Sequence, residues 1–234
     1  SVRVTNSVCK DDDGFIWASS KTGIIRLTDD DYRIYQLPYE TEGALMVWLI
    51  YRNSNLIAYT NNGQVFRYNQ IADKFDLLFN LNNLIDTRDF DVFSVLAGSE
   101  GNFWIALNTG LYHFHSGKLE KIGVTPASKY TLTTFDEHSF LIAGADGITQ
   151  LDMISGKRKV IYTSSGNELS SVSSVYFDRK LNTLWMGTLS DGLFSYQLGS
   201  GRFQSVLKST IPEQPILDIE ENSDSTLLIG IDGQ

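Results

Sequence analysis

Short apolar segments alternate with polar residues along the whole chain, and the pattern follows the two-residue period of a strand. Segments 93–96 (FSVL) and 172–177 (VSSVYF) are typical, because they are rich in β-branched and aromatic residues. Gly, Asn, Asp and Ser bound such segments and favour turns. No long segment carries a helical apolar stripe, so we expect an all-β protein.

This strand pattern repeats along the chain. Three segments align well: DGFIWASSKTGIIRL from Asp13, GNFWIALNTGLYHF from Gly101 and NTLWMGTLSDGLFSY from Asn182. Three weaker copies start at Asn53, Glu137 and Ser223. A glycine occupies one shared position in every copy: Gly23, Gly63, Gly110, Gly147, Gly192 and Gly233. The intervals between these glycines are 40, 47, 37, 45 and 41 residues, close to the roughly 40 to 50 residues of a four-stranded propeller blade.

The repeat therefore predicts a β-propeller of four-stranded antiparallel blades, with five full blades and the inner strands of a sixth. We expect one propeller domain over 1–234, with blades at 1–40, 41–82, 83–124, 125–166, 167–208 and 209–234. In the first blade the strands are expected at roughly 4–10, 15–20, 24–28 and 32–37. An open sheet edge presents unpaired backbone N–H and C=O groups that can pair with another chain. We therefore expect either a larger ring of about seven blades or a partner that covers the edges.

One position of the second strand holds a large apolar residue in every copy. It is tryptophan in the strong copies, at Trp17, Trp104 and Trp185, and aliphatic in the weaker ones, at Ile57, Leu141 and Leu228. A large side chain that recurs once per blade is expected to fill the space between adjacent blades. Stacking against a ligand is the alternative for the tryptophans.

Composition and charge exclude several classes of partner. The net charge is -9, and Lys and Arg form no dense block, so we expect no nucleic-acid binding. No apolar run reaches 18 residues, so we expect no membrane contact by this segment. The single cysteine, Cys9, cannot form a disulfide within the chain.

Motifs that carry catalysis or bind metals are missing. The sequence has no nucleophile elbow, zinc-protease motif, dinucleotide fingerprint or phosphate-binding loop. His113 and His115 would share one face of a strand, but only His138 remains as a further histidine ligand. Asp11, Asp12, Asp13 and Gly14 resemble a calcium loop without its alternating ligands and are read as a hairpin turn. We therefore expect no catalytic residue, no metal and no cofactor.

Ligand contacts are expected on the loops that gather at one face of a propeller, because the sheets hold these loops rigidly. The long connections are residues 38–44, 80–91, 123–130, 163–170 and 208–215, and the shorter turns add Lys21, Asn61, Asn62, Asn108, Asp146, Ser190 and Asp191. Amides, carboxylates and aromatic faces suit sugars. The candidate ligand-binding residues are Trp48, Asn61, Arg88, Asn108 and Asp146. An ordinary loop or core role is the alternative for each.

The repeat resembles the two-component regulator propeller repeat. The resemblance rests on a shared pattern of turn residue, Trp, small residues and Gly: Asp11, Gly14, Ile16, Trp17, Ala18 and Gly23; Gly101, Trp104, Ile105, Ala106, Gly110 and Leu111; Asp178, Leu184, Trp185, Met186, Gly187, Thr188, Asp191, Gly192 and Leu193; and Ile229, Gly230, Asp232 and Gly233. The second and fourth copies depart from it, with Ile57 and Leu141 in place of Trp.

This resemblance implies a segment of the periplasmic sensor region of a Bacteroidetes hybrid histidine kinase. It would detect glycan breakdown products or relay that signal to the kinase, and it would not itself be an enzyme. Its partners would be an oligosaccharide and the remaining propeller and sensor domains of the receptor, and pairing into a homodimer stays open. The alternatives are a general protein-interaction propeller, and a lyase or glycosidase. A glycosidase would need two convergent carboxylates, for which Asp89, Asp91, Asp146 and Asp191 are available.

Overall fold

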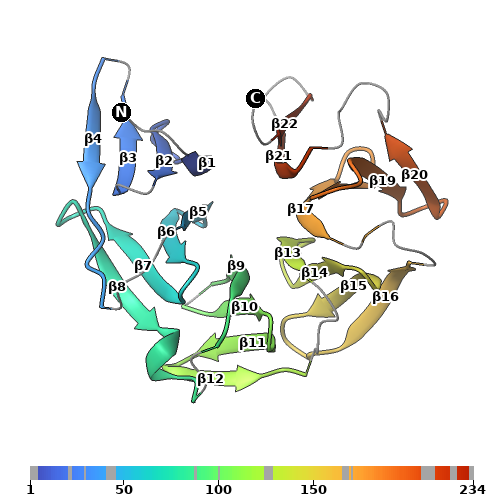
Figure 1. Ribbon diagram of the computed structural model, residues 1–234, viewed down its shortest axis with the longest axis horizontal. Helices are drawn as coiled ribbons and strands as arrows, with labels where there is room; N and C mark the ends of the chain where they lie inside the picture. Colours follow the sequence, from blue (N-terminus) through green and yellow to red (C-terminus); the bar gives the residue numbers. More distant parts are fainter. Residues whose placement is uncertain are drawn as a thin grey trace. The chain divides into compact units, whose positions relative to one another are not determined.

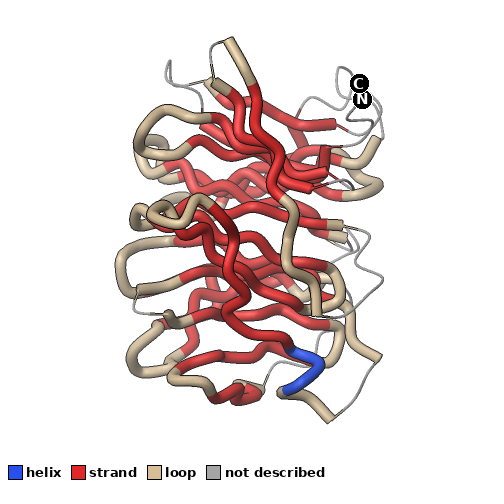
Figure 2. The backbone as a smooth tube through the Cα atoms, turned by 90° about the vertical axis from the view of Figure 1, so that its left-hand side faces the viewer, coloured by secondary structure: helices blue, strands red, loops and turns tan. Residues whose placement is uncertain are grey.

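The computed structural model describes residues 5–20, 23–28, 30–40, 46–86, 89–99, 101–123, 129–164, 169, 171–206, 214–221 and 226–231. Within these ranges the only helix is one short 3-10 turn, η1 (Leu81–Asn83), and strands dominate the backbone (Figure 2). The prediction of an all-β protein is confirmed. Gly233 and Arg88, which the sequence singled out, lie outside the described residues.

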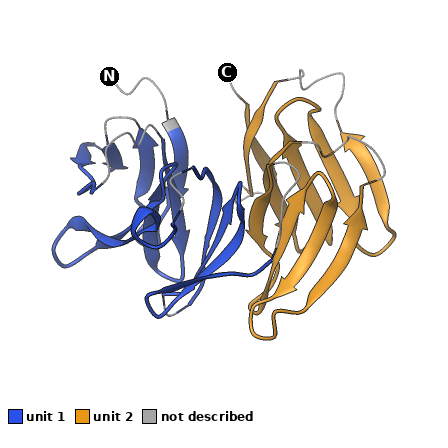
Figure 3. Ribbon diagram, turned by 60° about the horizontal axis from the view of Figure 1, so that its bottom comes forward, with its two compact units in different colours: residues 1–124 blue, residues 125–234 orange. Residues whose placement is uncertain are grey.

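Residues 1–124 form one compact unit (Figure 3) that holds three four-stranded antiparallel sheets. The first blade is β1 (Thr5–Lys10), β2 (Ile16–Ser20), β3 (Gly23–Leu27) and β4 (Tyr32–Tyr35). The second is β5 (Val47–Arg52), β6 (Asn55–Thr60), β7 (Gln64–Asn69) and β8 (Lys74–Asn80). The third is β9 (Val92–Ala97), β10 (Phe103–Leu107), β11 (Gly110–His115) and β12 (Lys118–Lys121). In each blade the strands pair in chain order, as consecutive hairpins (Figure 1).

Residues 125–234 form a second compact unit with two complete blades and two strands of another. The fourth blade is β13 (Thr131–Thr134), β14 (Ser139–Gly144), β15 (Gly147–Asp152) and β16 (Arg158–Thr163). The fifth is β17 (Val172–Asp178), β18 (Thr183–Thr188), β19 (Leu193–Gln197) and β20 (Arg202–Val206), and the sixth sheet is β21 (Ile216–Glu221) with β22 (Leu227–Ile231). The predicted fold, five four-stranded propeller blades and the inner strands of a sixth, is confirmed.

The recurrent tryptophan position lies at the packing surface between blades. Trp17 is 1% exposed, and its ring contacts Tyr68 and Phe75 of the second blade at centroid distances of 4.8 and 6.1 Å. In the second unit, Trp185 packs against a cluster that contains Ile216 and Ile219 of the sixth sheet. Burial of a large indole surface stabilises these two junctions, while the smaller Ile57 and Leu141 are buried at the same strand position in the second and fourth blades.

The recurrent glycines allow the second hairpin of each blade to close tightly. Gly23 has a φ of +135°, and a Cβ at this position would lie 2.5 Å from the Tyr35 carbonyl oxygen. Gly147 has a φ of +117°, and its Cβ would lie 2.1 Å from the Tyr162 carbonyl oxygen. Both the backbone conformation and the close approach of the fourth strand therefore exclude other residues. Positive φ angles also occur at Gly63, Gly110 and Gly192.

Serine hydroxyls join the inner strands of adjacent blades. In the first unit, the backbone N–H of Leu49 on β5 donates to Ser7 Oγ on β1 at 3.0 Å. In the second unit, Ser173 Oγ on β17 donates to the Ile216 carbonyl on β21 and, at 3.1 Å, to the Gly187 carbonyl of its own blade. Each serine lies where a register shift leaves its strand locally irregular, so its hydroxyl can reach the next blade.

Candidate functional site

The structure places Trp48 in strand β5 and not on a loop. Its ring stacks on Tyr59 of β6, with centroids 5.3 Å apart and planes at 18°, and the two residues are direct partners in the ladder. Trp48 also packs against the apolar cluster that contains Val92 and Phe90. Its geometry is that of a cross-strand aromatic pair.

Asn61 and Asn108 have equivalent positions in the turns between the second and third strands of their blades. The side-chain oxygen of Asn61 accepts a 3.1 Å hydrogen bond from the Met46 N–H, and that of Asn108 accepts a 2.9 Å bond from the Asp91 N–H. The Asn61 carbonyl also accepts from the Val92 N–H at 3.4 Å. Each side-chain amide thus holds the start of the inner strand of its own blade, and the backbone carbonyl of Asn61 also contacts the segment 91–92 that Asn108 bonds.

Asp146 lies in the second unit, in the turn between β14 and β15. Its side chain is exposed, and its carbonyl accepts from the Ser164 N–H at 3.3 Å. Of the five candidate residues, the structure brings Trp48, Asn61 and Asn108 into one region of the first unit and describes Asp146 separately. Their role as ligand contacts stays a prediction.

A denser group of polar side chains lies beside this region, at one end of the second blade. Three segments contribute to it: the connection that follows β4, the turn between β6 and β7, and the segment from the end of β8 through η1. We call it the blade-2 amide cluster, and it comprises Glu40, Thr60, Asn62, Gln64, Asn80, Asn82 and Asn83.

Two inner members of the blade-2 amide cluster are fully buried. Thr60 and Gln64 are both 0% exposed. Asn62 Oδ1 accepts from Thr60 Oγ1 at 2.6 Å and from Gln64 Nε2 at 3.2 Å, while the Gln64 N–H donates to Thr60 Oγ1 at 3.0 Å. Buried amides need such partners, and the network fixes the orientation of each one.

The outer part of the cluster joins the other two segments to this turn. Asn82 Nδ2 donates to the Asn62 carbonyl at 2.8 Å and to Asn80 Oδ1 at 2.9 Å. The Glu40 N–H donates to Gln64 Oε1 at 2.6 Å. At the surface, Glu40 Oε2 accepts long hydrogen bonds of 3.4 and 3.5 Å from the amides of Asn80 and Asn83. The side chains of Glu40 and Asn83 are exposed.

Sequence reasoning identified the loops of this cluster but missed most of its residues. The candidate connections 38–44 and 80–91 include Glu40, Asn82 and Asn83, and Asn62 was named among the short turns. Gln64 was missed because it begins a strand, and a polar residue there ordinarily faces solvent. A usable signal was present in the local sequence, since amides recur in NNGQ at 61–64 and in NLNN at 80–83.

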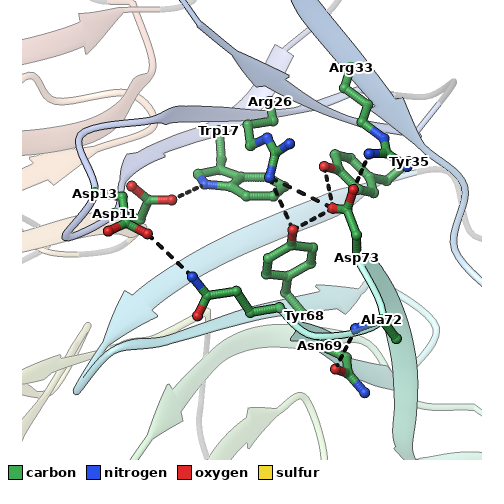
Figure 4. Close-up of polar contacts among 11 residues, drawn as sticks. Asp11, Asp13, Trp17, Arg26, Arg33, Tyr35, Tyr68, Asn69, Ala72 and Asp73 are labelled. Atoms are coloured by element: carbon green, nitrogen blue, oxygen red, sulfur yellow. Dashed lines mark hydrogen bonds and ion pairs between the residues drawn. The ribbon is translucent and has the colours of Figure 1, made fainter.

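A second polar cluster joins the first and second blades around Asp73 (Figure 4). Asp73 lies in the turn between β7 and β8 with a φ of +48°. Its carboxylate accepts from Tyr68 Oη at 2.5 Å, from Tyr35 Oη at 2.7 Å and from Arg33. Hydrogen bonds from Tyr68, and then from Tyr35, hold the pKa of Asp73 below its usual range.

Arg26 completes this Asp73 cluster. Its guanidinium lies 3.7 Å from Asp73 Oδ1, donates to Tyr68 Oη at 3.1 Å, and stands over the rings of Phe15 and Trp17 at 5.0 and 5.5 Å. The carboxylate and the phenols are thus engaged with each other. This arrangement holds the first and second blades together, and the Asp73 carboxylate is already paired with protein groups.

The described residues contain no group of three or more His, Cys, Asp or Glu side chains arranged to hold a metal. His113 and His115 do share a face, with stacked rings 5.9 Å apart, and His113 Nε2 contacts Asn102 Oδ1 at 3.1 Å. The Asp11 carboxylate accepts from Trp17 Nε1 at 2.7 Å, so the DDDG segment acts as a hairpin turn. In the part of the chain that is described, no helix is long and apolar enough to cross a membrane.

Comparison with known proteins supports the fold. No protein-family model matches the chain, and no curated protein matches it. Among solved structures, the extracellular domain of the hybrid two component system BT4673 from B. thetaiotaomicron is 20% identical, with a TM-score of 0.71 over 98% of this chain and 30% of that one. The corresponding domain of BT3049 is 17% identical, with a TM-score of 0.71 over 99% of this chain and 33% of that one.

These similarities define the chain as a β-propeller, with a fold like that in the extracellular domains of two hybrid two-component systems. The chain spans about a third of the length of these two relatives. Virginiamycin B lyase from Staphylococcus aureus also shares the fold, at 14% identity and a TM-score of 0.74 over 98% of this chain and 78% of that one. Propellers with different activities therefore resemble this chain, and function must be argued from its residues.

Proposed function

We propose that this chain is a non-catalytic segment of an extracytoplasmic, periplasmic sensor in a hybrid two-component system. In this role it detects glycan breakdown products, or relays their detection to a kinase in the same receptor. The observation that carries the proposal is the structural similarity, over 98% and 99% of the chain, to two extracellular domains of such systems. Its partners would be an oligosaccharide and the other domains of the receptor.

The polar clusters of the first unit support a binding role. In the Asp73 cluster the one carboxylate is fully engaged by phenols and guanidinium groups, so it is not poised to move a proton. In the blade-2 amide cluster, five of the seven members are neutral amides and Glu40 is the one carboxylate, so its described residues do not supply the two carboxyl groups that a glycosidase needs. Its exposed members, Glu40 and Asn83, offer an acceptor and an amide to a ligand.

A lyase is the second candidate, because virginiamycin B lyase has the same fold. Lyases and glycosidases need positioned acids and bases, and a glycosidase needs two carboxyl groups about 5 to 10 Å apart. The two functions differ in what happens to a bound sugar, since a sensor releases it unchanged and a lyase releases a cleaved, unsaturated product.

One experiment separates these functions. The purified chain is titrated calorimetrically with a panel of neutral and acidic oligosaccharides, and each mixture is then analysed by mass spectrometry after prolonged incubation. Binding with complete recovery of the intact sugar supports the sensor. Cleavage of any panel member would establish the lyase or glycosidase, and the absence of all binding would contradict detection by this segment.

The oligomeric state bears on the relay. Light scattering on the same samples, with and without a bound sugar, gives the mass of the particle. A dimer that forms or strengthens with the sugar would support transmission of the signal through pairing. A monomer under both conditions would place the relay in other domains of the receptor.

A further inference from the structure

We infer that the blade-2 amide cluster is a binding subsite for a neutral, hydroxyl-rich sugar, contacted by Glu40, Asn83 and Tyr39. This inference rests on the proposed function, because it names the site and the chemical class of ligand for the detection step. Four properties of the cluster carry it: a rigid base, exposed polar groups at its rim, an adjacent aromatic ring and the sign of its charge.

The base of the cluster is rigid because its amides are enclosed and bonded. Gln64 is 0% exposed and Asn80 is 4% exposed, and both are bonded to other members of the cluster. Three chain segments that are distant in sequence are thereby fixed to one another. A ligand that contacts their exposed groups would meet preorganised partners and order little of the protein on binding.

The rim presents groups that can exchange weak internal contacts for bonds to a ligand. Glu40 Oε2 accepts from the amides of Asn80 and Asn83 at 3.4 and 3.5 Å, the long end of the hydrogen-bond range. The side chains of Glu40 and Asn83 are exposed. A carboxylate beside a carboxamide offers both acceptors and donors, which matches the paired hydroxyls of a sugar ring.

An aromatic side chain stands next to the polar groups. Tyr39 is 41% exposed and directly precedes Glu40, and its ring packs edge-on against Phe66 with centroids 5.9 Å apart and planes at 89°. Phe66 and Gln64 share one face of β7, so Tyr39 lies beside the buried base of the cluster. A partly exposed aromatic ring that is held in place provides a surface for the C–H face of a sugar.

The charge of the cluster selects among sugars. Its seven members, all among the described residues, are five amides, one hydroxyl and one carboxylate, so none of these described members carries a positive charge. Within the described cluster, a uronate or sulfate group would meet the carboxylate of Glu40 and no guanidinium or ammonium group. By contrast, both arginines of the Asp73 cluster are already engaged with an internal carboxylate. The ligand of the blade-2 amide cluster is therefore an uncharged oligosaccharide.

The test compares the wild-type chain with three single variants, Glu40→Ala, Asn83→Ala and Tyr39→Ala. The matched controls are Glu120→Ala on β12 and Tyr32→Ala on β4, since Glu120 and Tyr32 are exposed residues of the same unit outside the cluster. The probes are gluco-, xylo- and manno-hexaoses as neutral sugars, and oligogalacturonates and sulfated disaccharides as acidic ones. Circular dichroism and thermal unfolding establish that each variant is folded.

We expect a neutral hexaose to bind the wild type and both controls, and each cluster variant to lose about tenfold in affinity or more, as expected for a lost hydrogen bond or ring contact of about 1.4 kcal/mol. Neutral binding that is unchanged in all three variants would place the site elsewhere and leave the proposed function standing. Binding of acidic sugars alone would overturn the ligand class assigned to this site. If no sugar of either class binds, both the subsite and detection by this segment are wrong.

Discussion

The carboxylate of Asp11 holds the indole of Trp17. Trp17 Nε1 donates to Asp11 Oδ2 at 2.7 Å, and the other oxygen, Oδ1, accepts from the Phe15 N–H at 2.8 Å. The aspartate in the first hairpin of the repeat therefore fixes the ring that packs between the first two blades. The contact is not shared by every blade, because in the fifth blade Trp185 Nε1 has no hydrogen-bond partner among the described residues.

Replacing Asp11 with Ala should destabilise the chain by about 1–3 kcal/mol, because the indole N–H and the Phe15 N–H each lose their partner. Asp13→Ala in the same turn is the control, since Asp13 makes only a long contact of 3.4 Å with Gln70. That control should change stability by about 0.5 kcal/mol or less. Urea unfolding, monitored by tryptophan fluorescence, measures the stability of both variants. Equal losses in the two variants would show that Asp11 does not stabilise the chain by holding Trp17.

The Asp73 cluster should make stability depend on pH. The pKa of the Asp73 carboxyl is lowered in the folded chain. Its contribution to the free energy of unfolding is therefore fully present above the usual aspartate pKa of about 4, and it is lost as the pH falls through the lowered value. Asp73→Asn should cost about 1–3 kcal/mol at pH 7, and the two proteins should converge in stability in acid. Denaturant unfolding from pH 2 to pH 7 measures this. A constant difference across that range would contradict an ionised Asp73.

Two glycines of the fourth blade should respond differently to the same substitution. Gly147→Ala places a Cβ 2.1 Å from the Tyr162 carbonyl oxygen at a φ of +117°, whereas Gly156→Ala, at a φ of +68°, meets nothing within 4 Å. We expect a loss of about 3 kcal/mol or more for Gly147→Ala, and only the backbone cost of about 1–2 kcal/mol for Gly156→Ala. Calorimetric unfolding ranks the two, and similar losses would mean that the fourth strand can yield to the added methyl group.

The serine contact between inner strands should also be measurable. Ser173→Ala removes the donor to the Ile216 and Gly187 carbonyls and should cost about 1–2 kcal/mol. Ser205→Ala, an exposed residue of β20 in the same unit, should have little effect. Hydrogen exchange should show the added opening of Ser173→Ala in β21. Unchanged exchange in that strand would show that the hydroxyl does not connect the two blades.

The repeat predicted the fold well because it records local requirements. A residue such as Gly23 is needed for the backbone at its own position, and Trp17 is needed at a junction that recurs in every blade. Such requirements return at each period and are visible in one sequence. For the first blade, the expected strands differ from the observed ones by at most two residues at either end.

The candidate site was harder to predict because its residues depend on contacts between distant segments. The sequence predicts Trp48 as a ligand contact, and only the structure shows that its ring stacks on Tyr59 inside the second blade. In the sequence Gln64 is an ordinary strand residue, and only the structure shows that its side chain donates to Asn62 in the preceding turn. The hydrogen-bond partners of an amide are set by tertiary structure, which no period in the sequence records.

The hairpins between the first and second strands carry a different polar contact at each described junction within a unit. Ser54 donates to Asp12 between the first and second blades, and Arg52 donates to the Ala97 carbonyl between the second and third. In the second unit, Arg179 donates to the Phe135 carbonyl, and Lys180 forms an ion pair with Glu221. Each junction thus has its own donor and acceptor.

This variety has a consequence for how the chain assembles. Blades of similar sequence can dock on the wrong neighbour, a failure typical of repeat proteins during folding. Apolar contacts are not directional, so the apolar surfaces of the blades discriminate less sharply between neighbours than paired polar groups do. A mismatched pair of hairpins would leave Lys180 without Glu221, or Asp12 without Ser54. These polar contacts therefore give each blade specificity for its own neighbour, because docking on another blade would leave charged and polar groups unpaired.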